Sequence, residues 1–534
     1  MTKEVDVIVI GAGVSGLYQV HQLREQGWDV LGLEAASDVG GTWYWNRYPG
    51  ARFDSESYIY QYLFDEKLYK DWTWSERFPA QPEIERWMHY VADRLDLRRS
   101  FEFSTRVESA TFDEETERWT VKTDQGDVYD TQFVIGCTGM LSAPLANRFP
   151  GQDSFKGQIV HTGLYPKGGL DIRGKRVGVI GTGATGIQVI QTIAREVGEL
   201  KVFVRSPQFS LPMRNPKFGP DEVKEYKGRF EELKSTLPNT FTGFEYDFEY
   251  AWADLTHEQR MARLEEIYND GSLKLWLASF SEMFFDQEVS DEISQFVREK
   301  MEARLKDPEL IRILVPQKGD AGFGKVRVPL ETNYLETYLL PHVEAVCVRH
   351  NPIAEIVPEG IRLEDGSVYD LDVIIMAVGF DAGTGGMSRI DITGRDGMTL
   401  RDEWNKETRT SLGMQVHGFP NLFMTGAPLA PSAALCNMTT CLQQQTEWIT
   451  GCLNHLRDNG KKVIEPSESF ERAWIKHHDE LVNASLFSKF DSWYNGSNIE
   501  GKPKRFMSYT GGAGTYKQKC QDVADSGYAG FETA

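Results

Sequence analysis

Several features that define other protein classes are scarce in these 534 residues. No apolar run reaches the roughly 18 residues that a membrane-spanning helix needs. The start, Met1-Thr2-Lys3-Glu4, leads directly into a strand pattern, so we expect no secretory signal. Basic residues number 58 against 79 acidic ones, and the net charge of −21 argues against nucleic acid or an anionic membrane as a partner.

Cysteines are also few and dispersed. The six lie at positions 137, 347, 436, 441, 452 and 520, and none forms a CxxC motif. We therefore expect no disulfide framework, no zinc site and no redox-active pair, and a reducing, cytoplasmic location. The length predicts about three lobes, and 40% apolar with 12% aromatic residues is typical of a folded chain with large buried sites.

The N-terminus carries a complete dinucleotide-binding pattern. Residues 5–10 form a β-branched strand pattern, Gly11-Ala12-Gly13-Val14-Ser15-Gly16 follows, and residues 17–25 have helical spacing. A second strand pattern over residues 29–33 ends at Glu34, which is placed to accept a hydrogen bond from a ribose hydroxyl. In this strand–turn–helix context the GxGxxG motif predicts a pyrophosphate site.

The same pattern recurs later in the chain. Residues 175–180 predict a strand, Gly181-Thr182-Gly183-Ala184-Thr185-Gly186 a phosphate turn, 187–195 a helix and 200–204 the returning strand. Arg205-Ser206 stands where the acidic residue would be. A guanidinium pairs with a 2′-phosphate that a carboxylate would repel, so this unit favours NADPH over NADH.

An aromatic loop over residues 40–54 follows the first unit. It contains Trp43, Tyr44, Trp45 and Tyr48 together with an Arg and an Asp. Indole and phenol rings are costly to leave in water, so the loop either covers a flat ligand or is an aromatic core loop. Because the first unit leads directly into this loop, we expect the first unit to bind a flavin.

Each unit is followed by a β-rich stretch that closes on small residues, at 107–139 and at 353–381. This arrangement resembles the two-dinucleotide-binding flavoproteins, in which the chain leaves the FAD domain, builds an NADPH domain and returns. The resemblance implies an α/β fold with two Rossmann-like dinucleotide-binding domains (FAD and NADP) and a helical insert. We expect the FAD-binding domain at 1–143 and 384–534, the NADP-binding domain at 144–213 and 325–383, and the insert at 214–324. Helical spacing in the insert is clearest at 283–305, and Thr256 to Gln259 predicts a capping box. The insert either packs over the cleft or is a solvated lobe without contact to substrate.

The order glycine pair, Trp, Tyr-Pro-Gly, Asp in residues 40–54 resembles the flavin-loop motif of the type I Baeyer–Villiger monooxygenases. Residues 155–166 are similar to the FxGxxxHxxxWP fingerprint of that family, with Tyr165 where Trp is usual. The fingerprint His, here His161, lies on a domain linker in the family, which implies a conformational role.

Three further segments resemble the same family. In residues 323–330, Arg327 matches an Arg that contacts the flavin, whereas Val326 stands where a Lys contacts the NADPH phosphate and Lys325 comes one residue early. Residues 491–503 are similar to a mobile loop whose Trp, here Trp493, contacts NADP and substrate. Glu500 replaces the usual Pro of that loop. Residues 431–438 resemble the segment beside the flavin ring.

The motifs and the resemblance together imply FAD at the first unit and NADPH at the second, with NADP⁺ retained during turnover. The expected cofactor-binding residues are Gly11, Gly13, Gly16, Glu34, Gly41, Thr42, Trp43, Asp54, Tyr60, Gly181, Gly183, Thr185, Gly186, Arg205, Ser206, Lys325, Trp493, Asn437 and Met438.

The resemblance also implies the chemistry. Arg327, oriented by Asp54, would hold a C4a-peroxyflavin in its anionic form so that it attacks a ketone, and an ester or lactone would be released. The partners would be O2 and a small-molecule ketone, and residues 327–336 resemble the branch that acts on large-ring and steroid ketones, which favours a cyclic or bulky substrate. A flavin-dependent S- or N-oxygenase, an NADPH oxidase or reductase, and a non-catalytic dinucleotide sensor are the alternatives.

Overall fold

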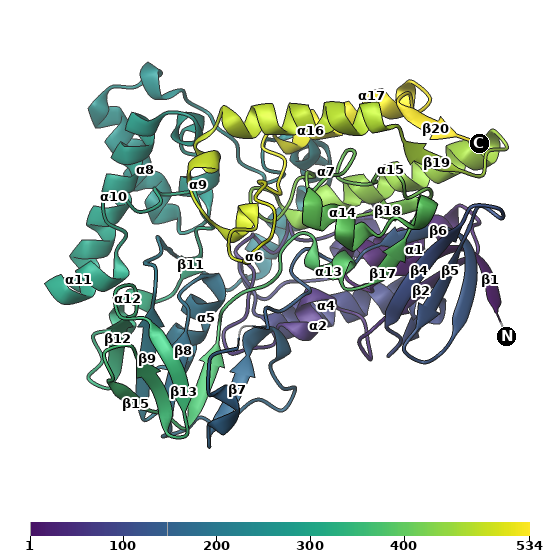
Figure 1. The fold of residues 1–534 in the computed structure, drawn as a ribbon. Helices are drawn as coiled ribbons and strands as arrows, with labels where there is room; N and C mark the ends of the chain where they lie inside the picture. The colour runs from purple at the N-terminus through teal and green to yellow at the C-terminus, as the bar shows by residue number, and fades with distance from the viewer. Residues whose placement is uncertain (1, 147) are drawn as a thin grey trace.

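The computed structural model describes residues 2–146 and 148–534 and has an α/β fold with two Rossmann-like sheets (Figure 1). The first sheet has the order β17-β4-β5-β6-β1-β2-β3, with β18 paired to β6. Its strands are β1 Lys3–Ile10, β2 Val30–Glu34, β3 Phe101–Phe103, β4 Val107–Asp113, β5 Arg118–Thr123, β6 Val128–Gly136, β17 Asp391–Thr393 and β18 Leu422–Met424.

The second sheet is parallel throughout, with the order β12-β9-β8-β16-β7. Its strands are β7 Gln158–His161, β8 Arg176–Ile180, β9 Glu199–Val204, β12 Val343–Cys347 and β16 Val373–Met376. Strands β8 and β16 are almost completely buried, as expected for a parallel sheet covered on both faces.

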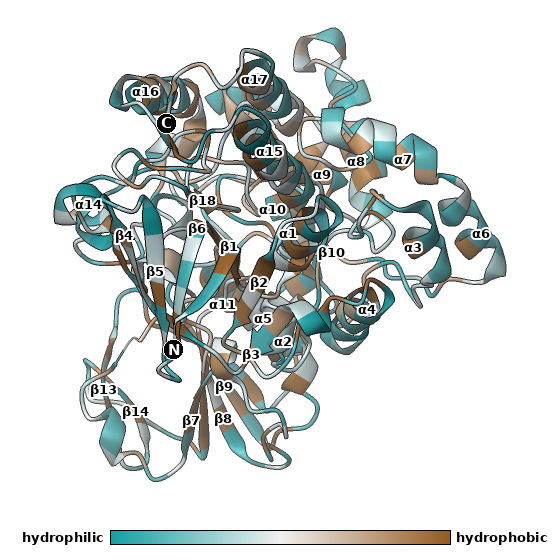
Figure 2. Cartoon of the chain, turned by 90° about the vertical axis from the view of Figure 1, so that its right-hand side faces the viewer, coloured by the Kyte–Doolittle hydropathy of each residue, from teal (hydrophilic) through white to brown (hydrophobic). Residues whose placement is uncertain are grey.

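Both predicted βαβ units are confirmed. In the first, β1 is followed by α1 Val14–Glu25 and pairs in parallel with β2. In the second, β8 is followed by α5 Ala184–Ile193 and pairs in parallel with β9. The β-rich stretch predicted at 107–139 contains the antiparallel pair β4–β5. Brown strands converge toward the middle of Figure 2, whereas the peripheral helices are largely teal, so the sheets supply much of the core.

The 214–324 region forms a helical lobe. Its helices α8 His257–Asp270, α9 Lys274–Leu277, α10 Gln287–Leu305 and α11 Pro308–Leu314 lie beside the second sheet (Figure 1). Its first two helices, α6 Pro220–Gly228 and α7 Phe230–Thr236, contact Tyr69 instead. The capping box at Thr256 is present. The helix predicted from residue 283 begins instead at Gln287, because the Asp286 side chain accepts hydrogen bonds from the Glu288 and Val289 N–H groups and starts a new helix there.

The C-terminal part returns to the first sheet. Its long helices are α15 Met438–Asp458, α16 Glu468–Asn483 and α17 Ala513–Asp525, and α15 packs on α1. Short helices that join the layers are α2 Thr42–Trp45, α3 Glu66–Asp71, α4 Gln81–Arg94, α12 Tyr334–Thr337, α13 Gly385–Ser388 and α14 Leu400–Lys406. The domain limits given above remain a prediction. No helix in residues 2–146 and 148–534 is long and apolar enough to cross a membrane.

Candidate active site

The first phosphate turn joins β1 to α1. Gly11 has φ +109°, and a Cβ there would lie 2.5 Å from the Cys137 carbonyl oxygen, so glycine is required. Gly16 is equally restricted, since its Cβ would meet the Gly11 carbonyl at 1.9 Å. Gly13 and Gly41 approach so closely that a Cβ on Gly41 would lie 2.7 Å from the Gly13 Cα. The turn therefore meets the start of the aromatic loop, as a site for one continuous ligand needs.

Glu34 lies at the carboxyl end of β2 and is buried. Its carboxylate accepts hydrogen bonds from the Ala12 and Ala36 N–H groups, both at 2.6 Å. Burial raises the Glu34 pKa, and the two N–H groups oppose that rise. Each carboxylate oxygen keeps a second lone pair, which can accept from a ribose hydroxyl as predicted.

The second phosphate turn is built in the same way. A Cβ on Gly186 would lie 2.2 Å from the Gly181 carbonyl, whereas Gly183 has open space around it where a pyrophosphate can approach. Thr185 lies in the first turn of α5. Arg205 and Ser206 follow β9 directly, and the Thr182 hydroxyl donates to the Ser206 carbonyl at 3.0 Å. The phosphate turn and the Arg205 loop are thus joined at one sheet edge.

The aromatic loop lies between the two nucleotide-binding units. Thr42 begins α2, and the Trp43 indole packs edge-on against Phe53 and Tyr60, donating to the Tyr60 hydroxyl at 3.2 Å. On the other side, the Tyr48 hydroxyl donates to the side-chain oxygen of Gln188 on α5 at 2.9 Å. The loop is therefore docked on the second unit as well as the first.

The aromatic loop also delivers Asp54 to Arg327. The Arg327 guanidinium lies 3.1 Å from Asp54 Oδ2 and donates to the Ala433 carbonyl at 3.1 Å. Asp54 is 5% exposed; burial raises its pKa, while Arg327 and the Leu330 N–H oppose that rise. Segments about 270 residues apart in sequence thus meet in one buried ion pair.

The helical lobe contacts this pair directly. The Arg327 guanidinium lies 5.4 Å from the centre of the Trp276 ring, and Trp276 from α9 is completely buried. The Trp276 indole donates to the Gly324 carbonyl at 3.1 Å, which fixes the ring beside the segment that carries Arg327. The Asn437 N–H donates to the Thr242 carbonyl of the lobe at 2.8 Å. The lobe is part of the wall of the site.

Lys325 lies two residues from Arg327 but points elsewhere. Its side chain is buried, and its amine donates to the Met283 carbonyl in the helical lobe. Burial lowers the Lys325 pKa to about 7. In this structure the amine therefore does not face the Arg205 edge, where the phosphate is expected.

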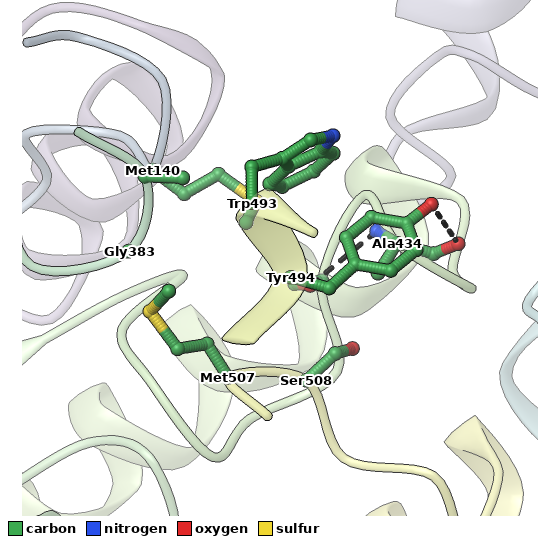
Figure 3. Close-up of a pocket in the computed structure, with 9 residues that line it drawn as sticks. Met140, Gly383, Ala434, Trp493, Tyr494, Met507 and Ser508 are labelled. Carbon is green, nitrogen blue, oxygen red and sulfur yellow. Dashed lines mark hydrogen bonds between the residues drawn. The ribbon is translucent and has the colours of Figure 1, made fainter. Parts of the chain in front are cut away.

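Trp493 lies on the C-terminal loop and lines a small hollow (Figure 3). The hollow is lined by Met140, Ala382, Gly383, Ser432, Ala434, Trp493, Tyr494, Met507 and Ser508. The Tyr494 hydroxyl donates to the Ala434 carbonyl at 3.3 Å, one residue from the carbonyl that holds Arg327. The loop is attached by Lys502, whose amine lies 2.6 Å from Asp381 Oδ1.

Asn437 and Met438 form the start of α15, next to an unexpected disulfide. Asn437 is buried, and its side-chain amide donates to the Ile59 carbonyl at 2.9 Å. The sequence predicts no disulfide framework, and the structure has a single disulfide, between Cys436 and Cys441, with the other four cysteines free. The spacing CxxxxC is no recognised motif, and only the turn into α15 brings the two side chains together.

His161 ends β7 at the junction between the sheets. Its Nδ1 accepts from the Gly163 N–H at 3.0 Å, so Nε2 carries the proton and donates to the Gly379 carbonyl at 3.2 Å. Burial lowers its pKa, which favours this neutral form. The ring connects the end of β7 to the loop that follows β16, and its conformational role stays a prediction.

The residues present fit the two expected cofactors. Both phosphate turns offer glycine backbone and a helix N-terminus, and Asp54 Oδ1 is buried without a hydrogen-bond partner among residues 2–146 and 148–534. A buried carboxylate oxygen without a partner is costly, so a donor from a ligand is expected there. No group of His, Cys, Asp or Glu in the described chain is arranged to hold a metal ion.

Several contacts of the site carry no sequence signal. Trp276 belongs to a segment without a motif. Gln188 and Tyr494 lie within recognised segments, but neither is a motif residue, and their contacts follow only from how the chain folds. The Tyr48–Gln188 hydrogen bond joins residues 140 positions apart. Aromatic residues in the lobe were visible in the sequence, but helical spacing alone does not distinguish a site wall from core.

Known proteins resemble this chain over its full length. A family model for FMO-like proteins, described as flavin-binding monooxygenase-like, matches residues 3–258. Acetone monooxygenase (methyl acetate-forming) from Gordonia sp. (strain TY-5) is 64% identical over 530 residues, 99% of each chain. Cyclohexanone monooxygenase from Rhodococcus sp. Phi1 bound to NADP⁺ has a TM-score of 0.96 at 37% identity, covering 100% of this chain and 99% of that one. OTEMO in complex with FAD and NADP has a TM-score of 0.95 at 39% identity over 99% of both chains.

Proposed function

This chain belongs to the Baeyer–Villiger monooxygenases of the flavin-binding monooxygenase-like family, and from that premise we propose that it converts a small acyclic ketone, such as acetone, to an ester. It uses FAD, NADPH and O2. The observation that carries the proposal is the Arg327 guanidinium, held by Asp54 and Ala433 against the buried Trp276 ring.

Bound FAD, reduced by NADPH, supplies the activation of O2. The chain's own contribution is a fixed positive charge, since a guanidinium keeps its proton at any physiological pH. The Arg327 guanidinium donates one hydrogen bond to Asp54 and one to the Ala433 carbonyl. These two bonds orient the guanidinium and leave its other N–H groups for the reacting oxygens. A preorganised cation of this kind stabilises negative charge that develops on oxygen.

Water must be kept from the reacting atoms. The Trp276 ring lies against the Arg327 guanidinium, the Tyr494 hydroxyl donates to the Ala434 carbonyl, and Trp493 lines the same hollow as Ala434. Excluding water strengthens the Arg327 charge and suppresses the loss of activated oxygen as hydrogen peroxide. The lobe and the C-terminal loop are therefore proposed to contribute to coupling, that is, to the yield of ester per NADPH.

The choice of a small substrate, rather than the cyclic or bulky ketone that residues 327–336 suggested, is supported by one relative. The Gordonia protein is named for acetone and is 64% identical along the chain. This likeness favours a short-chain ketone.

NADPH is proposed to bind with its pyrophosphate at the Gly181–Gly186 turn and its 2′-phosphate at Arg205. Arg205 is exposed at the carboxyl edge of the second sheet, and no hydrogen bond or ion pair occupies its guanidinium in the described residues. Glu34, by contrast, suits a ribose without a 2′-phosphate, as in FAD. A cytoplasmic location is also part of the proposal; it is supported by the four free cysteines, with Cys436–Cys441 as a single local disulfide.

Purified, FAD-loaded protein should consume NADPH faster when acetone is added and release methyl acetate. A series of acetone, butanone, cyclopentanone and cyclohexanone should show kcat/KM falling with size. An S- or N-oxygenase would respond to sulfides or amines instead. An oxidase or reductase would consume NADPH at a rate that no ketone changes, and a dinucleotide sensor would bind NADPH without turnover.

A further inference from the structure

Two arginines leave adjacent strands at the carboxyl edge of the second sheet. β9 ends at Val204 and is followed by Arg205, while β12 ends at Cys347 and leads through Val348 to Arg349. Val204 and Cys347 are register partners, and the Val348 N–H donates to the Val204 carbonyl at 2.9 Å. The chain therefore places Arg349 beside the Arg205 loop.

The Arg349 side chain is held in one orientation. Its Nε donates to the Arg205 carbonyl at 3.2 Å, and its Nη1 lies 3.1 Å from Asp320 Oδ1. Nη2 has no hydrogen bond or ion pair within residues 2–146 and 148–534. The Nη2 group of Arg349 can therefore donate to a ligand that also reaches the exposed Arg205.

This edge also lies next to the phosphate turn. The Thr182 hydroxyl donates to the Ser206 carbonyl at 3.0 Å, so the Arg205 loop is fixed to the turn that meets the pyrophosphate. In a βαβ unit the adenosine ribose lies between these two loops. A dianionic 2′-phosphate carries more charge than one guanidinium neutralises, and planar forks suit bidentate binding.

The lysine expected to share this task is turned away. The Lys325 amine is buried against the Met283 carbonyl, and Val326 is apolar. Arg205 would otherwise be the one basic residue of the predicted set at the phosphate. Arg349 supplies a second positive charge where that lysine does not.

We propose that Arg349 reads the 2′-phosphate of NADPH together with Arg205, and that Asp320 is a positioning residue that orients the Arg349 guanidinium. The inference rests on the proposed use of NADPH and names a residue outside both phosphate-turn motifs. Asp320 lies seven positions before Arg327 in the sequence, in the segment that leads to it. Through the Arg349–Asp320 ion pair, the Arg205 edge is joined to the start of that segment.

The test is calorimetric binding of 2′,5′-ADP and 5′-AMP to FAD-loaded protein. Arg349→Ala should weaken 2′,5′-ADP roughly 10- to 150-fold, the effect of a charged hydrogen bond to phosphate, and leave 5′-AMP unchanged. Arg349→Lys should restore part of the loss, because it keeps the charge but not the fork. Asp320→Asn should cause a smaller loss, again for 2′,5′-ADP alone.

Arg362→Ala is the matched control, since Arg362 is an exposed arginine of the same region that pairs with Glu355 on β13 Ile353–Val357. It should change neither affinity. Equal weakening of both ligands in Arg349→Ala, or no weakening of either, would overturn the inference. If the parent protein binds 2′,5′-ADP and 5′-AMP equally, the proposed use of NADPH is wrong. If the parent prefers 2′,5′-ADP but Arg349→Ala keeps that preference, only the inference about Arg349 is wrong.

Discussion

Replacing Arg327 by alanine should abolish ester formation while FAD stays bound. The guanidinium contacts Asp54 and Ala433 at 3.1 Å each and is in place before the reaction. Removing one preorganised donor to a developing oxyanion costs about 10²–10³ in rate. NADPH consumption should continue, with its electrons diverted to hydrogen peroxide.

The substitution also leaves Asp54 alone in a buried position. Burial already raises the Asp54 pKa, and loss of the Arg327 charge removes the main opposing effect, so the pKa should rise further. The carboxyl group would then bind a proton rather than remain an unpaired buried charge. The double variant Arg327→Ala/Asp54→Asn should therefore match the stability of Arg327→Ala, yet form no more ester.

The assay measures ester and hydrogen peroxide per NADPH in parent, Arg327→Ala, Arg327→Lys and the double variant. Arg327→Lys should recover only part of the ester yield, because an ammonium lacks the fork that reaches Asp54 and Ala433 together. Flavin absorbance serves as the control for cofactor binding. Ester yield near the parent value in Arg327→Ala would refute the reasoning and reduce Arg327 to a structural partner of Asp54.

Four further results are expected. Arg205→Ala should lower kcat/KM for NADPH roughly 10- to 150-fold and spare NADH, whereas Lys325→Ala should have the smaller effect; equal losses for both nucleotides would contradict the role of Arg205. Trp276→Leu should raise kcat/KM for cyclohexanone relative to acetone roughly 10-fold, and an unchanged ratio would remove Trp276 from the substrate wall.

Because the Lys325 pKa is lowered to about 7, the unfolded chain binds one more proton than the folded one from about pH 7 up to the ordinary lysine pKa. The free energy of unfolding of the parent, minus that of Lys325→Met, should therefore rise with pH in that window, by up to about 1.4 kcal/mol per pH unit. A difference that stays constant with pH in denaturant unfolding would contradict the buried lysine. Alkylation of unfolded, unreduced protein should label four of six cysteines and spare Cys436 and Cys441, and six labels would contradict the disulfide.

The two phosphate turns could be predicted from the sequence because their geometry depends on a few consecutive residues. Gly11 and Gly181 have positive φ angles and lie against the backbone of a neighbouring strand end, and the spacing of glycines in GxGxxG predicts both positions. Glu34 and Arg205 follow their strands at the expected points. These features depend on a few consecutive residues, so a motif contains all the required information.

The remaining parts depend on distant contacts. Trp276 reaches Arg327 because the helical lobe folds back on the site, and the Cys436–Cys441 disulfide depends on where α15 begins. The orientation of Lys325 could not be read from its position next to a known motif, since burial against Met283 decided it. Packing across long sequence separations leaves no periodic pattern in the sequence.

The central claim is that one atom of O2 is inserted next to a ketone carbonyl. Turnover of acetone with NADPH under ¹⁸O2, followed by mass spectrometry of the product, tests it most directly. The account predicts methyl acetate that contains one ¹⁸O atom per molecule, formed in proportion to the NADPH consumed. Unlabelled product, or NADPH consumption that yields only hydrogen peroxide whichever ketone is supplied, would contradict it.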